Sequence, residues 1–346
     1  MEQQLFVGLD VSQKLTHICV VDTAGKVVWQ GKCLSAPETV AAVIRDKAPD
    51  AVKIGFESGP LATWFWHALK DMGLPVVCLD AQHAKQALKM QVNKTDRNDA
   101  HGLAQIVRTG WYREVGVKSI ASHLIRSVLG ARAQLVGMRT ETTNQIRGIL
   151  KTFGIVLPGA GGQTFERKVQ ELANGQGMLA NTLRALLEVY NNLKEQIDVF
   201  DRHINTYAKH NQVCHRLMTV PGVGRLTAVA FMTAIDDPAK FRKSRNVGAF
   251  FGLTPRTEQS GDSNIKKRIS KWGDGLVRCY LYEAANVLLT RVEEWSALKA
   301  WGLRIAKRSG MNKARVAVAR KLAIIMHRMW LTGEQFQWSA KQQAAA

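Results

Sequence analysis

The order of short apolar runs in the first hundred residues constrains the fold more than any other feature of this sequence. Three runs follow one another closely, separated only by turns, as in strands that pair as hairpins. Further strand-like runs then alternate with segments of helical periodicity. The predicted strands are 5–10, 16–22, 26–30, 51–57 and 75–80, and the predicted helices are 35–48, 61–73 and 81–91. This order predicts a mixed sheet flanked by helices.

Four carboxylates occupy positions that such a fold would bring close together. Asp10 ends the first predicted strand and Glu57 the fourth, while Asp96 and Asp99 share one face at the start of a helix. Acids placed at strand ends and a helix start can converge on one rim of a sheet. There they could hold two Mg²⁺ ions about 4 Å apart for phosphoryl transfer. As alternatives, Asp96 could cap its helix, Asp99 could face solvent and Asp10 could be a turn residue.

The middle of the chain carries a seven-residue apolar repeat. Its members fall at alternating steps of three and four, which is typical of a coiled-coil seam. The seam consists of Leu183, Leu186, Tyr190, Leu193, Ile197, Phe200, Ile204 and Tyr207. Its predicted partner is either the preceding helix, around 124–150, or the same helix of another subunit. The glycine-rich residues 158–163 form the predicted loop between these two long helices.

Basic residues accumulate toward the end of the chain. Residues 216–346 hold 23 of the 48 Lys and Arg residues and 9 of the 28 acids, whereas residues 1–115 hold 13 bases and 12 acids. Thirteen of the C-terminal bases are arginines, whose planar guanidinium suits phosphate. This imbalance predicts a nucleic-acid partner bound mainly through residues 216–346, in preference to a surface that is merely solvated by lysine.

Cysteine spacing and hydropathy indicate the cellular compartment in which the chain works. The five cysteines are odd in number and show no metal-site or redox-motif spacing, which predicts a reduced cytoplasmic chain without structural zinc. The apolar runs are shorter than the ~20 residues that span a bilayer, and the N-terminus does not resemble a signal peptide. We therefore expect no membrane partner.

Two motifs in the basic C-terminal part point to phosphate chemistry. Residues 220–224 could expose backbone N–H groups at a helix start, as in helix-hairpin-helix DNA binders, although a tight turn without a ligand explains them equally well. In the second motif, residues 251–261, Ser260 beside Gly261 could approach a phosphodiester, although Ser-Gly is usually a turn. Ser263 and Ser270 are nearby alternatives. The residues expected to contact nucleic acid are Gly222, Gly224, Arg225, Arg256, Lys266, Lys267, Arg268 and Lys271.

Together these motifs resemble one family over nearly the whole chain. It is the one-ten family of DEDD insertion-sequence transposases, which are bridge-RNA-guided serine recombinases with a RuvC-like N-terminal domain. The segments that resemble the family's acidic motifs are 8–12, 57–59 and 94–100. The segments that resemble its C-terminal transposase domain are 221–224, 252–256, 260–261 and 269–271.

The resemblance implies a mechanism that the residues alone do not establish. It implies that Ser260 attacks the DNA phosphodiester and becomes covalently linked to it, while Asp10, Glu57, Asp96 and Asp99 assist with Mg²⁺. It further implies that one subunit supplies the acids and another the serine, in dimers that assemble into a tetramer. The tetramer would exchange strands between donor and target DNA, both chosen by a noncoding RNA of the element. We expect such a protein in the bacterial cytoplasm, at the nucleoid when active.

These observations predict three regions. Residues 1–115 form an α/β domain with an RNase H, RuvC-like fold, residues 116–212 a helical coiled-coil linker and oligomerisation region, and residues 213–346 a basic, mainly α transposase domain with a helix-hairpin-helix-like element. Two rival functions are a RuvC-like hydrolytic junction endonuclease, which needs no serine, and a non-catalytic nucleic-acid binder. Acids gathered on an otherwise basic protein favour an enzyme, because a binder has no use for them.

Overall fold

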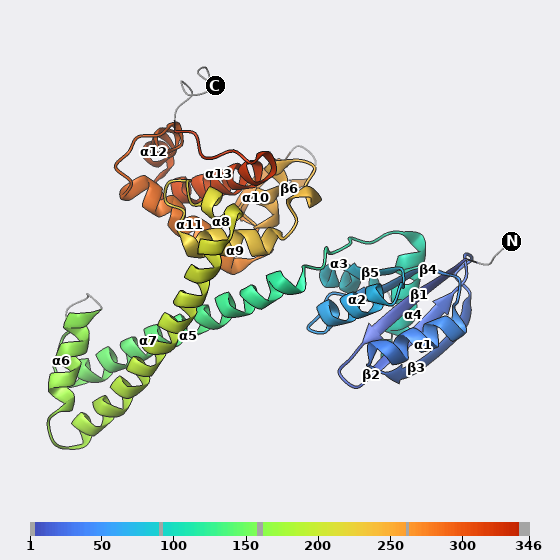
Figure 1. Cartoon of the computed structure of the whole chain (residues 1–346), viewed down its shortest axis with the longest axis horizontal. Helices are drawn as coiled ribbons and strands as arrows, with labels where there is room; N and C mark the ends of the chain where they lie inside the picture. Colours follow the sequence, from blue (N-terminus) through green and yellow to red (C-terminus); the bar gives the residue numbers. More distant parts are fainter. Residues whose placement is uncertain (1–3, 90–92, 158–161, 261–262, 339–346) are drawn as a thin grey trace. The chain divides into compact units, whose positions relative to one another are not determined.

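The computed structural model describes residues 4–89, 93–157, 162–260 and 263–338. The chain divides into two compact units, Met1–Ile120 and Ala121–Ala346 (Figure 1). Within the described residues, no helix has the length and apolar character needed to cross a membrane.

The N-terminal unit is built on a five-stranded mixed sheet. Its strands are Leu5–Val11 (β1), Leu15–Val21 (β2), Val27–Leu34 (β3), Ala51–Glu57 (β4) and Val76–Leu79 (β5), in the order β3-β2-β1-β4-β5. β1, β2 and β3 pair antiparallel, whereas β4 pairs parallel to β1 and β5 parallel to β4. The predicted mixed sheet is therefore confirmed.

Helices cover both faces of this sheet. They are Pro37–Lys47 (α1), Ala62–Asp71 (α2), Ala81–Leu88 (α3) and Asp96–Thr109 (α4). Leu5, Val7 and Leu9 of β1 pack with α1 and α2, because alternate residues of a strand point to one face. The opposite face, which carries Cys19 and Leu79, packs against α3 and α4. This second face holds the candidate site.

The C-terminal unit is mostly helical. Its helices are Ile120–Thr152 (α5), Gln163–Ala173 (α6), Met178–His210 (α7), Gln212–Leu217 (α8), Arg225–Ile235 (α9), Val247–Phe250 (α10), Gly275–Thr290 (α11), Ala297–Ser309 (α12) and Met311–Thr332 (α13). Short 3-10 helices span Pro238–Lys240 and Ser244–Asn246. α9 is apolar on all sides and is buried from Thr227 to Ile235, packed against α7, α8 and α11.

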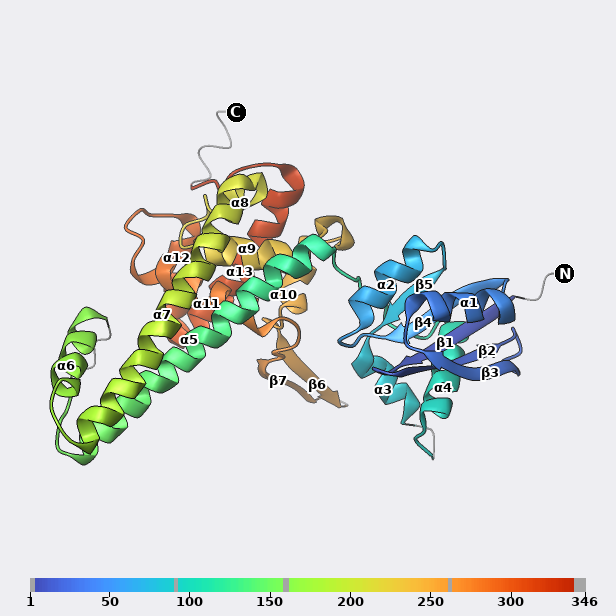
Figure 2. The same ribbon diagram turned by 60° about the horizontal axis from the view of Figure 1, so that its bottom comes forward.

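The long helices α5 and α7 are antiparallel neighbours within one chain (Figure 2). The beginning of α5 packs with the end of α7, and the end of α5, at Ile146 and Leu150, packs with the beginning of α7. Arg132 of α5 forms a bidentate ion pair with Asp201 of α7, at 2.5 and 3.1 Å. Of the two predicted partners, the preceding helix is the one observed. A coiled coil between subunits stays a prediction.

The predicted seam differs from the buried face of α7 at three of its members. Phe200 and Tyr207 are only half-buried, and Ala208 is buried beside Tyr207. Leu187 is buried, whereas Leu186 is only half-buried. In this region α7 packs against α6 as well as α5, so its apolar face is wider than a two-helix seam.

A β-hairpin interrupts the helices of this unit. Its strands are Pro255–Ser260 (β6) and Ser263–Ile269 (β7), which pair antiparallel (Figure 2). No strands were expected here from the sequence. Residues 255–259 are all polar or proline, and the polar ones are exposed, so the alternation that reveals a half-buried strand is missing.

Candidate active site

Two glycines let α4 lie directly on the sheet. Gly8 of β1 and Gly55 of β4 are partners in the parallel register. A Cβ on Gly8 would stand 2.2 Å from the Ala100 carbonyl oxygen and the Ala104 nitrogen, both in the backbone of α4. A Cβ on Gly55 would stand 2.2 Å from a methyl carbon of Val107, also on α4. The absence of side chains at this pair therefore sets how closely the helix approaches.

Asp10 and Glu57 each follow one of these glycines by two residues. Because side chains two positions apart point to the same face of a strand, both carboxylates lie on the face that α4 covers. The pairing of Leu9 with Phe56 places them side by side at the carboxyl ends of adjacent parallel strands. The predicted convergence of these two acids thus has a specific structural basis.

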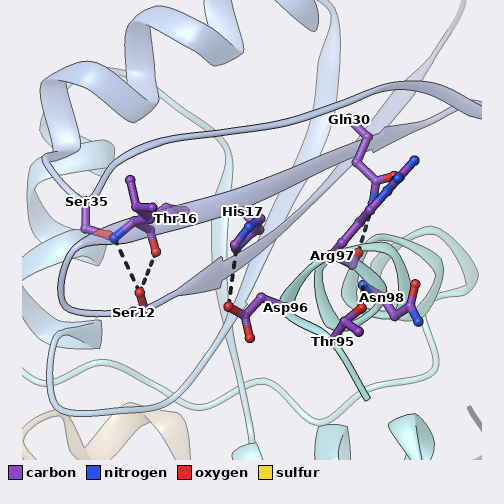
Figure 3. A network of polar contacts seen from close by, with 10 residues as sticks. Ser12, Thr16, His17, Gln30, Ser35, Thr95, Asp96, Arg97 and Asn98 are labelled. Carbon is purple, nitrogen blue, oxygen red and sulfur yellow. Dashed lines mark hydrogen bonds and ion pairs between the residues drawn. The ribbon is translucent and has the colours of Figure 1, made fainter. Parts of the chain in front are cut away.

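The first turn of α4 is held in place by two sets of hydrogen bonds. The Thr95 hydroxyl caps the helix by accepting the N–H of Asn98 at 3.2 Å. The Arg97 Nε donates to the side-chain carbonyl of Gln30 at 2.7 Å, and the Gln30 amide donates to the Arg97 carbonyl at 2.9 Å (Figure 3). Because Thr95 is the cap, capping does not account for Asp96.

Asp96 lies beside Asp10 and a histidine that the sequence analysis missed. Asp10, His17 and Asp96 each bring one possible ligand atom within 4.8 Å of the other two. The His17 Nδ1 is 3.7 Å from an Asp96 carboxylate oxygen (Figure 3). His17 is the register partner of Asp10 across β1 and β2, and this pairing is the signal that could have found it.

The other two acids are coupled to this group through their charge. Burial raises the pKa of the Asp10 carboxyl, and the negative charges of Asp96 and Asp99 raise it further. Burial also raises the pKa of Glu57, with further contributions from Asp10 and Asp99. Lys94 lowers the pKa of both groups. Partly buried carboxylates that repel one another are stabilised by a cation, so the donor chemistry of this group fits a divalent metal ion.

The residue after Glu57 has a structural role. The Ser58 hydroxyl accepts the N–H of Ala81 at 3.1 Å, and the Ser58 N–H donates to the Leu79 carbonyl at 2.8 Å. These bonds tie the end of β4 to the end of β5 and the beginning of α3. They fix the backbone that carries the Glu57 carboxylate.

In the C-terminal unit, the predicted nucleophile lies on the hairpin. Ser260 is the last residue of β6, and its backbone pairs with that of Ser263, the first residue of β7. Gly261 lies outside the described residues. Ser270 follows the far end of β7, about 20 Å along the strand from Ser263, and its N–H donates to the Thr254 carbonyl at the base of the hairpin. Ser270 is therefore distant from Ser260 along the hairpin, whereas Ser263 lies directly opposite Ser260.

Cationic side chains line a cavity of about 630 Å³ beside the hairpin. Its lining residues are Arg256, Lys267, Arg268, Ile269 and Lys313. Lys313, near the start of α13, is a lining residue that the sequence analysis did not single out. Lys267 also forms an ion pair with Glu258 across the hairpin. Lys271 is exposed at the hairpin base. A concave surface with this charge suits a phosphate backbone.

Residues 221–224, with the sequence Pro-Gly-Val-Gly, form a turn between the six-residue helix α8 and the buried helix α9. A Cβ on Gly222 would stand 2.4 Å from the Ala284 carbonyl oxygen of α11, so packing accounts for this glycine. Gly224 and Arg225 are exposed at the N-terminus of α9. A phosphate contact there, and a helix-hairpin-helix function, stay predictions.

Comparison with known proteins agrees with this arrangement of fold and acids. Residues 7–155, which contain all four carboxylates, match a transposase model of the DEDD type of IS110. Residues 214–301, which contain the hairpin, match the model described as "Transposase IS116/IS110/IS902 family".

Full-length relatives support the same assignment. The chain is 30% identical to the transposase for insertion sequence element IS1111A of Coxiella burnetii, over 98% of this chain and 93% of the relative. It is 29% identical to the transposase for element IS1328 of Yersinia enterocolitica, over 94% and 96%. It is 24% identical to the pilin gene-inverting protein of Moraxella bovis, over 69% and 83%. These matches indicate a DNA-processing enzyme. The chain belongs to the IS116/IS110/IS902 family of transposases.

Proposed function

We propose that this transposase cleaves and rejoins DNA through a covalent phosphoserine intermediate at Ser260. In this proposal Asp10, Glu57, Asp96 and Asp99 hold divalent metal ions. The observation that supports this proposal is the arrangement of the acids on the sheet face beneath α4. There the paired glycines bring the start of the helix onto two strand-end carboxylates, Asp10 and Glu57, whose pKa values are raised by burial and by the negative charge of neighbouring acids.

Two Mg²⁺ ions at such a site would activate the attacking oxygen and stabilise the leaving oxygen. The chain's own contribution is positional. The hydrogen bonds of Thr95 and Arg97 fix the turn that carries Asp96 and Asp99, and those of Ser58 fix the end of β4. The carboxylates are thus held ready for the ions, which limits the reorganisation needed when DNA binds.

Covalent attachment at the serine conserves the energy of the phosphodiester. The Ser260 Oγ forms a bond to phosphorus while one backbone P–O bond breaks. The serine gives up its proton, and the departing oxygen takes one up and leaves as a hydroxyl. A hydroxyl of another strand then gives up its proton and attacks phosphorus, which breaks the bond between phosphorus and the Ser260 oxygen. The serine oxygen takes up a proton and the strands are joined, so no external energy source is required. Arg256, Arg268 and Lys313 would bind the neighbouring phosphates.

We infer the assembly and the guide from the family resemblance. The acids lie in the N-terminal unit and Ser260 in the C-terminal unit, so the site can be completed by two subunits. Dimers assembling into a tetramer would hold donor and target DNA together, and a noncoding RNA would choose both. Light scattering of the protein with nucleic acid should show at least a dimer, whereas a monomer at micromolar concentration would contradict this assembly.

The proposal is tested with element-end DNA, Mg²⁺ and the transcript that flanks the gene, analysed on denaturing gels. Cleavage should require the metal and disappear in D10N, E57Q, D96N and D99N. The control E38Q, at an exposed position of α1 on the other face of the sheet, should cleave normally. Free cut ends that form without Ser260 would support the hydrolytic nuclease instead. Binding without any cleavage would support the non-catalytic binder.

A further inference from the structure

We propose that His17 is a fifth ligand of the metal centre and shifts its preference from Mg²⁺ toward transition-metal ions such as Mn²⁺. This inference rests on the proposed metal site and assigns a metal class to it. It concerns a side chain that contributes nitrogen to a group of oxygen donors.

The strand register places His17 at the site. It is the partner of Asp10 across β1 and β2, and Cys19, two residues further along, is the partner of Gly8. Cys19 packs with the α4 residues Ala100 and Ala104. Because His17 shares its face of the strand with Cys19, its imidazole lies on the same side as the carboxylates. His17 is only 22% exposed at its side chain, so it is not a freely solvated surface group.

The spacing of the three side chains suits a shared ion. The His17 Nδ1 and the Asp96 oxygen are 3.7 Å apart, which is longer than the 2.7–3.2 Å of a hydrogen bond. Adjacent ligands of an octahedral ion bound at about 2.1 Å lie about 3 Å apart, and opposite ligands about 4 Å apart. The donor atoms of Asp10, His17 and Asp96, all within 4.8 Å of one another, need only small movements to reach these values.

Nitrogen ligation has a chemical consequence. Mg²⁺ takes oxygen ligands almost exclusively, whereas transition-metal ions accept imidazole readily. A site made only of the four carboxylates would be expected to use Mg²⁺ well. The addition of His17 gives a mixed nitrogen and oxygen set, which strengthens binding of Mn²⁺ and of the later divalent ions more than binding of Mg²⁺.

The direct test is pulsed electron paramagnetic resonance of Mn²⁺ bound to the full-length wild-type protein. Coupling of Mn²⁺ to a nitrogen-14 nucleus is expected, and it should vanish in H17Q. The control H101Q removes an imidazole of α4 that pairs with Gln105 at 3.1 Å, and should leave the coupling unchanged. Mn²⁺ bound to the wild type without nitrogen coupling would overturn the proposal, whether or not H17Q folds.

Calorimetric titration gives a second and independent readout. H17Q should bind Mn²⁺ on the order of tenfold more weakly, while Mg²⁺ affinity changes by less than about threefold. Equal losses for the two ions, or no loss, would overturn the role of His17. The variant D10N distinguishes a failure of His17 as a ligand from a failure of the whole metal site. If Mn²⁺ binding depends on Asp10 but not on His17, the metal centre stands and the fifth ligand is wrong. If Mn²⁺ binding is independent of both residues, the proposed metal site fails as well.

Discussion

The Gly8→Ala substitution tests how the carboxylates are brought together. The added Cβ would stand 2.2 Å from two backbone atoms of α4, the Ala100 oxygen and the Ala104 nitrogen, whereas ordinary contact begins at 3.4 Å. Backbone atoms cannot rotate away as a side chain can, so α4 must retreat by about 1 Å or the strand must bend. Overpacking of this kind costs about 1–3 kcal/mol.

The functional loss should exceed the loss of stability. Asp96 and Asp99 lie on α4 and move with it, whereas Asp10 stays in place on β1. A misplacement of about 1 Å can cost on the order of 100-fold in rate, so strand cleavage should fall by one to two orders of magnitude in a protein that still folds. Hydrogen exchange of the β1 and α4 peptides should also accelerate, and divalent metal should protect them less than in the wild type.

The matched control is Gly59→Ala, two residues after Glu57. A Cβ at that position meets no heavy atom of the described residues within 4 Å, so cleavage and hydrogen exchange should remain near wild type. If Gly8→Ala cleaves as well as Gly59→Ala, the close approach of α4 does not organise the site and this reasoning is refuted.

Three further predictions concern charge. The raised pKa values of Asp10 and Glu57 mean that the folded metal-free protein binds protons at these groups more tightly than the unfolded chain does. Their contribution to stability is therefore present below about pH 4 and is lost as the pH rises through their pKa values in the folded protein. Thermal unfolding near pH 7 should therefore show D10N to be more stable than the wild type without metal and less responsive to Mg²⁺; an unchanged Mg²⁺ response would argue against Asp10 as a ligand. Burial lowers the pKa of His327, which hydrogen-bonds to Ser244 and the Pro238 carbonyl, so the C-terminal unit should lose stability as the pH falls below about 6.5; hydrogen exchange of α13 should report this loss, and no change between pH 7 and 5 would contradict it. K313A and R268A should each reduce the slope of log affinity against log salt by about 1, whereas an unchanged slope would exclude a phosphate contact.

Much of the N-terminal fold follows from the sequence because β1, β2, β4 and β5 bury apolar side chains. The apolar positions of β1, β2 and β4 alternate or run together as the packing against α1 and α2 requires. β3 extends to Leu34, beyond the predicted end at residue 30. It lies at the sheet edge, where pairing with β2 continues past the polar residues Gln30 and Lys32.

The acids of the site were predictable, but the way they are assembled was not. Asp10, Glu57, Asp96 and Asp99 stand at the ends of recognisable elements. That Gly8 and Gly55 are neighbours depends on the register of β1 and β4, which no local pattern specifies. His17 is missed for the same reason, because a single histidine in a strand has no signal until its partner across the hairpin is known.

The most direct test of the central claim is to map where DNA becomes attached. A DNA substrate nicked so that the leaving strand dissociates should trap the covalent species, and mass spectrometry of the digested protein should find the nucleotide on Ser260. The adduct should require divalent metal, should be absent in S260A and D10N, and should persist in S263A, the variant of its backbone partner on β7. Attachment at Ser263, or hydrolysed ends with no adduct at all, would contradict the proposed mechanism.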